Sequence, residues 1–138
     1  LHYPLRRQRQ MCIRDSLLED AAVVALAGQR VYWVTRPQAS SLPAVVMQTI
    51  SDPRPQHLKG VQELRETRVQ IDAFALKYQE VRQLAEAIIG TLLPEQAGNG
   101  IVFSRAMVDG VRDLGEQTGT HYVYRASIDM RVWWQTEE

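Results

Sequence analysis

The C-terminal stretch from His121 to Trp134 alternates between polar and apolar side chains, and this pattern constrains the fold more than any other feature. Successive side chains of a β-strand point to opposite faces of a sheet, so one face of this stretch is apolar and the other is polar. The alternation predicts an antiparallel strand with one face against helices and the other free. The apolar side is formed by Tyr122, Tyr124, Ala126, Ile128, Met130, Val132 and Trp134, and the polar side by His121, Arg125, Ser127, Asp129 and Arg131.

The chain upstream alternates between helical and extended patterns. Apolar residues at helical spacing predict helices over 17–27 and 77–93. Strands are predicted over 30–34, 44–50 and 67–75, and from Ile101 onward with a bulge or turn at Asp109–Gly110. A hairpin loop at 115–119 joins the last two strands. The sequence therefore predicts an α+β fold, with a mainly antiparallel sheet of four to five strands and two helices packed on one face.

The segment from Asp52 to Glu66 is a long charged connection that contains Pro53, Pro55 and Gly60. Connections of this length in a compact domain are usually functional or mobile. We expect it to contact other proteins.

The N-terminal segment differs from the rest of the chain. Residues 1–10 have no helical or strand periodicity, and Met11–Ser16 resembles the translation of a transposon end used in sequencing-library adapters. Arg6–Arg9 also fits a basic arm that binds nucleic acid. We interpret residues 1–16 as a non-native leader because of this adapter-like sequence, and we leave them out of the fold prediction. Residues 17–138 are then one domain.

Composition and charge narrow the classes of function. The chain has 138 residues with 45% hydrophobic and 23% charged residues, as in an ordinary globular domain. Residues 17–138 hold 12 basic and 15 acidic residues, a net charge of −3, which argues against a broad nucleic-acid surface. The apolar runs are too short to cross a bilayer. We therefore expect neither a membrane partner nor sequence-specific nucleic-acid binding.

Residues for catalysis or metal binding are sparse. The glycines form no phosphate-binding loop, and Cys12 alone cannot build a disulfide or a thiolate cluster. His57 and His121 are far apart and fit solvated surface residues better than a metal site. Asp72 and Asp129 fit either a carboxylate pair for acid–base chemistry or cross-strand partners of arginines, and abundant arginines on the same faces favour the second interpretation. We predict no catalytic residue, cofactor or metal.

Trp133 is the unusual residue on the polar side of the last strand. Its neighbour Trp134 points to the apolar side, so Trp133 must lie beside Arg131 and Asp129. A large aromatic side chain surrounded by charges is typical of an interface anchor with a polar rim, although a lone exposed aromatic is the alternative. We expect Trp133 to become buried when the protein oligomerises.

Five segments together resemble the phage tail-completion proteins, a family of minor tail and head–tail joining proteins. They are Asp20–Leu26, Leu42–Val46, Arg68–Ala75, the helix containing Ala85–Ala87, and Ser127–Trp134. The resemblance spans about residues 17–136 and departs at Asp109–Gly110. It implies a tail-terminator-like fold in a virion protein at the head-proximal end of the tail. Its implied partners are further copies of itself, as a ring and in particular a hexamer, the tail tube protein and the head-side connector.

These considerations give one candidate interface and two rival functions. The rivals are a head-side adaptor or stopper and, less favoured, a small ligand-binding or enzymatic domain. The enzymatic alternative requires a concave pocket with convergent polar groups. The predicted interface residues lie on the polar sheet face and in the long connection, and they are Trp133, Arg131, Asp129, Arg125, Arg68, Asp72, Arg54, His57 and Lys59.

Overall fold

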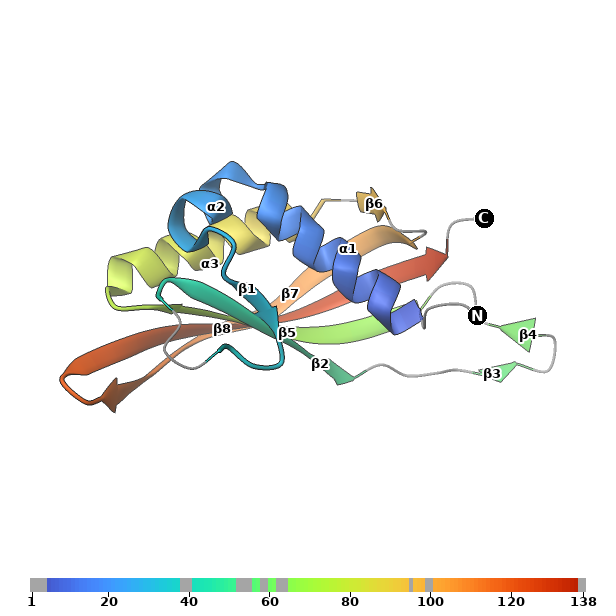
Figure 1. Cartoon of the computed structure of the whole chain (residues 1–138). Coiled ribbons are helices and arrows are strands. Elements are labelled where there is room, and N and C mark those ends of the chain that lie inside the picture. The colour runs from blue at the N-terminus through green and yellow to red at the C-terminus, as the bar shows by residue number, and fades with distance from the viewer. Residues whose placement is uncertain are drawn as a thin grey trace.

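A curled six-stranded sheet forms the body of the protein, and three helices lie on one of its faces (Figure 1). This computed structural model describes residues 5–37, 41–51, 56–57, 60–61, 65–94, 96–98 and 101–136. The elements in chain order are α1 (Leu5–Glu19), α2 (Ala21–Ala27), β1 (Val31–Trp33), β2 (Ala44–Ser51), β3 (Gln56–His57), β4 (Gly60–Val61), β5 (Arg65–Ala75), α3 (Tyr78–Leu92), β6 (Gln96–Gly98), β7 (Ile101–Thr118) and β8 (His121–Thr136).

The large sheet has the strand order β1-β2-β5-β8-β7-β6, and β3 and β4 form a separate two-stranded ribbon. All pairings in the large sheet are antiparallel except β1 with β2, so the sheet is mixed and larger than predicted. In the parallel pair, β2 runs in the same direction as β1, with Val31 opposite Val45 and Trp33 opposite Met47. Directly after β1, Val34 has a φ of 72°, and its N–H donates to the Met47 carbonyl at 2.7 Å.

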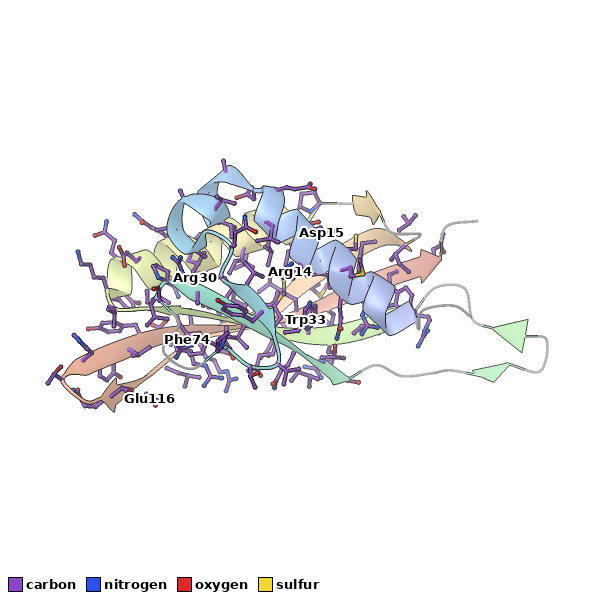
Figure 2. The ribbon with its side chains drawn as sticks, in the orientation of Figure 1. Arg14, Asp15, Arg30, Trp33, Phe74 and Glu116 are labelled. Atoms are coloured by element: carbon purple, nitrogen blue, oxygen red, sulfur yellow. The ribbon has the colours of Figure 1, made fainter. Side chains whose placement is uncertain are left out.

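The helical layer contains one helix more than predicted. The chain breaks at Asp20, which divides the predicted 17–27 helix, and α1 extends back to Leu5. Tertiary contacts stabilise α1 although its sequence has a weak apolar stripe. Arg14 Nε donates to the Val31 carbonyl at 2.8 Å and Trp33 Nε1 donates to the Gln10 carbonyl at 3.2 Å, where α1 crosses β1 (Figure 2). No helix in the described ranges is long and apolar enough to span a membrane.

The core lies between the helices and the sheet. The predicted stripe of α3 is confirmed, because Val81, Leu84, Ala85, Ile88 and Leu92 are all buried. The predicted apolar side of β8 is buried from Ala126 to Trp134, whereas Tyr122 is 44% exposed near the hairpin tip. Trp134 is fully buried and its Nε1 donates to the Thr67 hydroxyl at 2.8 Å. This satisfied donor allows a large aromatic side chain to fill the centre of the core.

The β7–β8 hairpin is longer and tighter than predicted. Its strands continue to Thr118 and His121, and a two-residue turn at Gly119–Thr120 replaces the predicted 115–119 loop. Gly119 has a φ of 60°, which a residue without a Cβ adopts at no steric cost. The predicted irregularity at Asp109–Gly110 is confirmed as a register shift between Val108 and Gly110. The tip of the hairpin projects beyond the other strands (Figure 1).

Candidate interface on the uncovered sheet face

The face of the sheet opposite the helices, called the uncovered face below, carries polar and charged side chains from β2, β5, β7 and β8. Alternation directs the even-numbered residues of β5 and the odd-numbered residues of β8 to this face, while their neighbours enter the core. The register sets Arg68 opposite Arg131 and Asp72 opposite Ser127. Two clusters of charged residues result, one around Arg131 and one around Arg125.

The first cluster, called the Arg131 cluster, contains Glu66, Arg68, Asp109, Arg131 and Trp133. Arg131 binds the Asp109 carboxylate through Nε at 3.0 and 3.1 Å and through Nη2 at 3.0 Å. Its Nη1 lies 3.9 Å from Glu66 Oε2, and Arg68 Nη2 lies 3.8 Å from Asp109 Oδ2. Hydrogen bonding to Asp109 raises the pKa of Arg131. Two cations and two carboxylates therefore give a neutral cluster.

The bulge in β7 explains this neutrality. Arg68 and Arg131 face each other directly, and like charges in that position destabilise a sheet. Val108 pairs with Met130 and Gly110 with Asp129, so Asp109 is the extra residue of the bulge. A bulge re-aims the side chain of its extra residue, and here the Asp109 carboxylate reaches both arginines.

Trp133 lies on the face that the alternation predicts. It is half-buried, on the side of β8 opposite the fully buried Trp134. The Arg131 guanidinium lies 5.5 Å from its ring centroid, within the range of a cation–π contact. The neighbouring Met107 on β7 is 41% exposed. Exposed apolar area beside a neutral ion-pair network resembles the core and rim of a protein interface.

The second cluster, called the Arg125 cluster, consists of Gln70, Asp72, Phe74 and Arg125. The Asp72 side chain is 9% exposed, and its Oδ2 accepts hydrogen bonds from Arg125 Nη2 at 2.8 Å and Gln70 Nε2 at 3.0 Å. The Arg125 guanidinium also lies 5.7 Å from the Phe74 ring centroid. The predicted pairing of Asp72 with a cross-strand arginine is therefore present.

An open groove of about 460 Å³ runs along the Arg125 cluster, between it and the 34–37 segment. Its lining also includes Val46 and Gln48 of β2. This is the concavity that an enzymatic function would require, but its carboxylate, Asp72, is already bound by Arg125 and Gln70. In the part of the chain that the structure describes, no group of three or more His, Cys, Asp or Glu residues could hold a metal ion.

The structure brings together some of the predicted interface residues and leaves others apart. Arg68, Arg131 and Trp133 meet in one cluster, and Asp72 and Arg125 meet in the other. Asp129 lies on the same face, paired in register with Gln70, and the carboxylate that Arg131 binds is Asp109 instead. His57 belongs to β3, but its side chain, Arg54 and Lys59 lie outside what the structure describes.

The predicted interface residues did not include Glu66, Gln70, Phe74 or Asp109. The sequence did indicate a bulge at Asp109, because Asp-Gly within an extended stretch is typical of one. It could not indicate that Asp109 binds Arg131 and Arg68, because that contact depends on the register of three strands. Phe74 and Gln70 share the parity of Asp72, so the alternation of β5 alone places them on the uncovered face.

Fold and surface together define a class of small α+β proteins with a broad charged sheet face. A chain in a structure titled as the virion of a native gene transfer agent particle has this fold, with a TM-score of 0.67 and 18% identity over 97% of this chain and 99% of that one. A second solved structure matches with a TM-score of 0.50 and 12% identity, over 97% of this chain and 94% of the other. No curated protein matches the chain.

The family is established by sequence. The model of the family described as Tail completion protein gp17 matches residues 11–135, and the chain belongs to that family. This confirms the resemblance found in the sequence, and the match begins inside the segment interpreted as a leader. The protein is thus a structural component of a phage-like virion tail.

Proposed function

We propose that this protein completes the tail tube and joins it to the head as a ring of identical subunits, without catalysing a reaction. A hexamer is the ring that the family resemblance suggests. The similar chain in a virion particle supports an assembly role. The observation that carries the proposal is the Arg131 cluster, where a half-exposed Trp133 and an exposed Met107 border a neutral ion-pair network.

Trp133 tests the subunit contact. Trp133→Ala removes the aromatic anchor, so rings seen by electron microscopy and mass photometry are expected to dissociate into smaller species. Leu93→Ala is the matched control, because Leu93 is 41% exposed at the end of α3, away from this face. Rings of unchanged size and stability in Trp133→Ala would overturn the role of this cluster.

We propose that the 52–66 connection, which contains the ribbon β3–β4 and whose last two residues begin β5, contacts the tail tube or a neighbouring subunit. The ribbon extends from the end of the molecule opposite the β7–β8 tip (Figure 1). Replacing residues 52–64 with a short glycine linker is expected to give tails that fail to join heads. Head-joined tails of normal length from that variant would contradict this contact.

A head-side adaptor or stopper is the alternative from the same class. Loss of a terminator leaves tube growth unchecked, whereas loss of an adaptor or stopper leaves tails of normal length that are not joined. Electron microscopy of tails made without the protein separates the two. Overlong tubes support tail completion, and unjoined tails of normal length support the alternative.

We also propose that residues 1–16 derive from a sequencing adapter rather than from the phage. Sequencing the same gene from intact phage particles tests this. Recovery of codons 1–15 in frame in genuine phage DNA would refute it.

A further inference from the structure

The outer edge of β7 differs sharply between its two halves. In the first half, β6 pairs with residues 101–103 and register shifts occur at Phe103/Arg105 and Val108/Gly110. Bulges of this kind protect an exposed edge against pairing with another chain. From Val111 to Thr118 the register with β8 is unbroken, and no described strand pairs with the outer side.

The backbone of this second half offers an open row of donors and acceptors. The two-residue turn pairs Thr118 with His121, and antiparallel pairs alternate between bonded and non-bonded. Residues 112, 114, 116 and 118 therefore direct their N–H and C=O groups toward β8. Residues 111, 113, 115 and 117 direct theirs outward, and residues 112–118 are all exposed.

The side chains along the edge are arranged symmetrically. Arg112, Leu114 and Glu116 share the uncovered face, and Leu114 is 40% exposed midway between two opposite charges. Among the described residues, neither Arg112 nor Glu116 forms an ion pair within its own chain. Asp113 on the other face is already bound by Tyr78 Oη at 3.0 Å and Arg82 Nη1 at 3.3 Å.

We propose that residues 111–118 pair with the same residues of a second copy of this chain, antiparallel and centred on Leu114. In this register Arg112 lies opposite Glu116 of the second copy and Glu116 opposite its Arg112. The outward-directed residues 111, 113, 115 and 117 also face one another, so that backbone hydrogen bonds form. If the contact were centred on residue 113, the Asp113 carboxylates of the two chains would face each other. If it were centred on residue 115, neither Arg112 nor Glu116 would face an opposite charge.

This contact is separate from the ring contact of the proposed function. A two-fold contact joins the same patch on both copies, whereas a ring of more than two subunits needs two different patches on each subunit. The β7 edge therefore pairs free subunits, or joins two rings back to back, by extending the sheet across both chains. The Arg131 cluster remains available for the ring.

Charge reversal tests the register. Arg112→Glu or Glu116→Arg places like charges opposite each other twice in each pair, so the dissociation constant measured by sedimentation velocity should rise at least about tenfold. The double variant R112E/E116R restores both opposite-charge pairs and should restore pairing. The proposal is overturned if the unmodified protein is monomeric at about 100 µM, or if the double variant is no tighter than the single ones.

A disulfide tests the centre of the contact. In a non-bonded antiparallel pair the two Cα atoms lie about 4.5 Å apart, a separation that a disulfide spans. Leu114→Cys in a Cys12→Ala background should therefore give a covalent dimer under mild oxidation. Thr118→Cys is the matched control, because Thr118 is exposed on the same strand but would lie far from its counterpart. Equal cross-linking of both variants would contradict the register.

A Trp133→Ala background separates this inference from the proposed function. If edge dimers persist there while rings are lost, both contacts are supported. If rings never form but Leu114→Cys dimers do, the ring proposal fails and the edge contact stands. If rings form without any cross-linking at Leu114, the edge contact fails and the ring proposal stands.

Discussion

At the scale of single residues, the uncovered face depends on side chains that satisfy one another. The Asp72 side chain is only 9% exposed, and a carboxylate this deeply buried is stable only with hydrogen-bonding partners. Arg125 and Gln70 are those partners. The same contacts make the groove a poor site for acid–base chemistry, because the Asp72 carboxylate already accepts hydrogen bonds from Arg125 and Gln70.

The first prediction concerns this pair. Arg125→Ala leaves the Asp72 carboxylate without its cation, so the free energy of unfolding should fall by about 1–3 kcal/mol. The double variant with Asp72→Ala should lose less than the sum of the two single losses, because the residues interact directly. Urea denaturation of the four proteins measures this, and strictly additive losses would show that the contact contributes nothing.

The second prediction concerns pH. Cys12 is 4% exposed, and burial, followed by the negative charges of Asp15 and Glu19, raises the pKa of its thiol from 9.0 to about 11. Between these two pH values the unfolded chain loses the proton while the folded chain keeps it. The unfolded state then binds fewer protons, so stability falls as pH rises, by roughly 2–3 kcal/mol in total.

Cys12→Ala is the control for that prediction. It removes the thiol titration and leaves the tyrosines and lysines unchanged, so the variant should lose less stability between pH 9 and pH 11 than the unmodified protein does. Denaturation curves over this interval measure the difference. Identical slopes would mean that the Cys12 thiol titrates normally in the folded protein.

At the scale of elements, some features could be predicted from local pattern and others could not. The alternation of β8 and the stripe of α3 are periodic over many residues, which makes burial readable from sequence. The direction of β1 relative to β2 leaves no periodic signal in the sequence, and the role of Asp109 depends on the register of three strands. α1 depends on contacts such as Trp33 to Gln10, which lie far apart in the chain.

The third prediction concerns the short helix α2. The Asp20 side chain accepts hydrogen bonds from the N–H groups of Ala22 and Val23, both at 3.1 Å, and so begins the helix. Asp20→Ala should cost about 0.5–2 kcal/mol of folding free energy. Asp20→Asn retains an accepting oxygen and should cost markedly less. Thermal denaturation ranks the variants, and equal losses would argue against a capping role.

At the scale of the whole molecule, the helical layer includes residues interpreted as a non-native leader. Cys12 and Ile13 are buried, and Ile13 lines a void of about 20 Å³ with Leu92 and Phe103. The sheet therefore has an apolar surface at this position that some segment must cover. We expect the native gene to encode a helix there with apolar residues at the positions of Cys12 and Ile13.

The last prediction follows from that surface. Deleting residues 1–16 removes the buried side chains of Arg9, Cys12 and Ile13 and exposes Leu92 and Phe103, so the free energy of unfolding should fall by about 2–5 kcal/mol. Deleting residues 1–8 is the control, because the residues described as buried begin at Arg9. Urea denaturation of both truncations measures the difference. Equal stability of the two would mean that α1 is an appendage, and the native segment would then need no apolar residues at these positions.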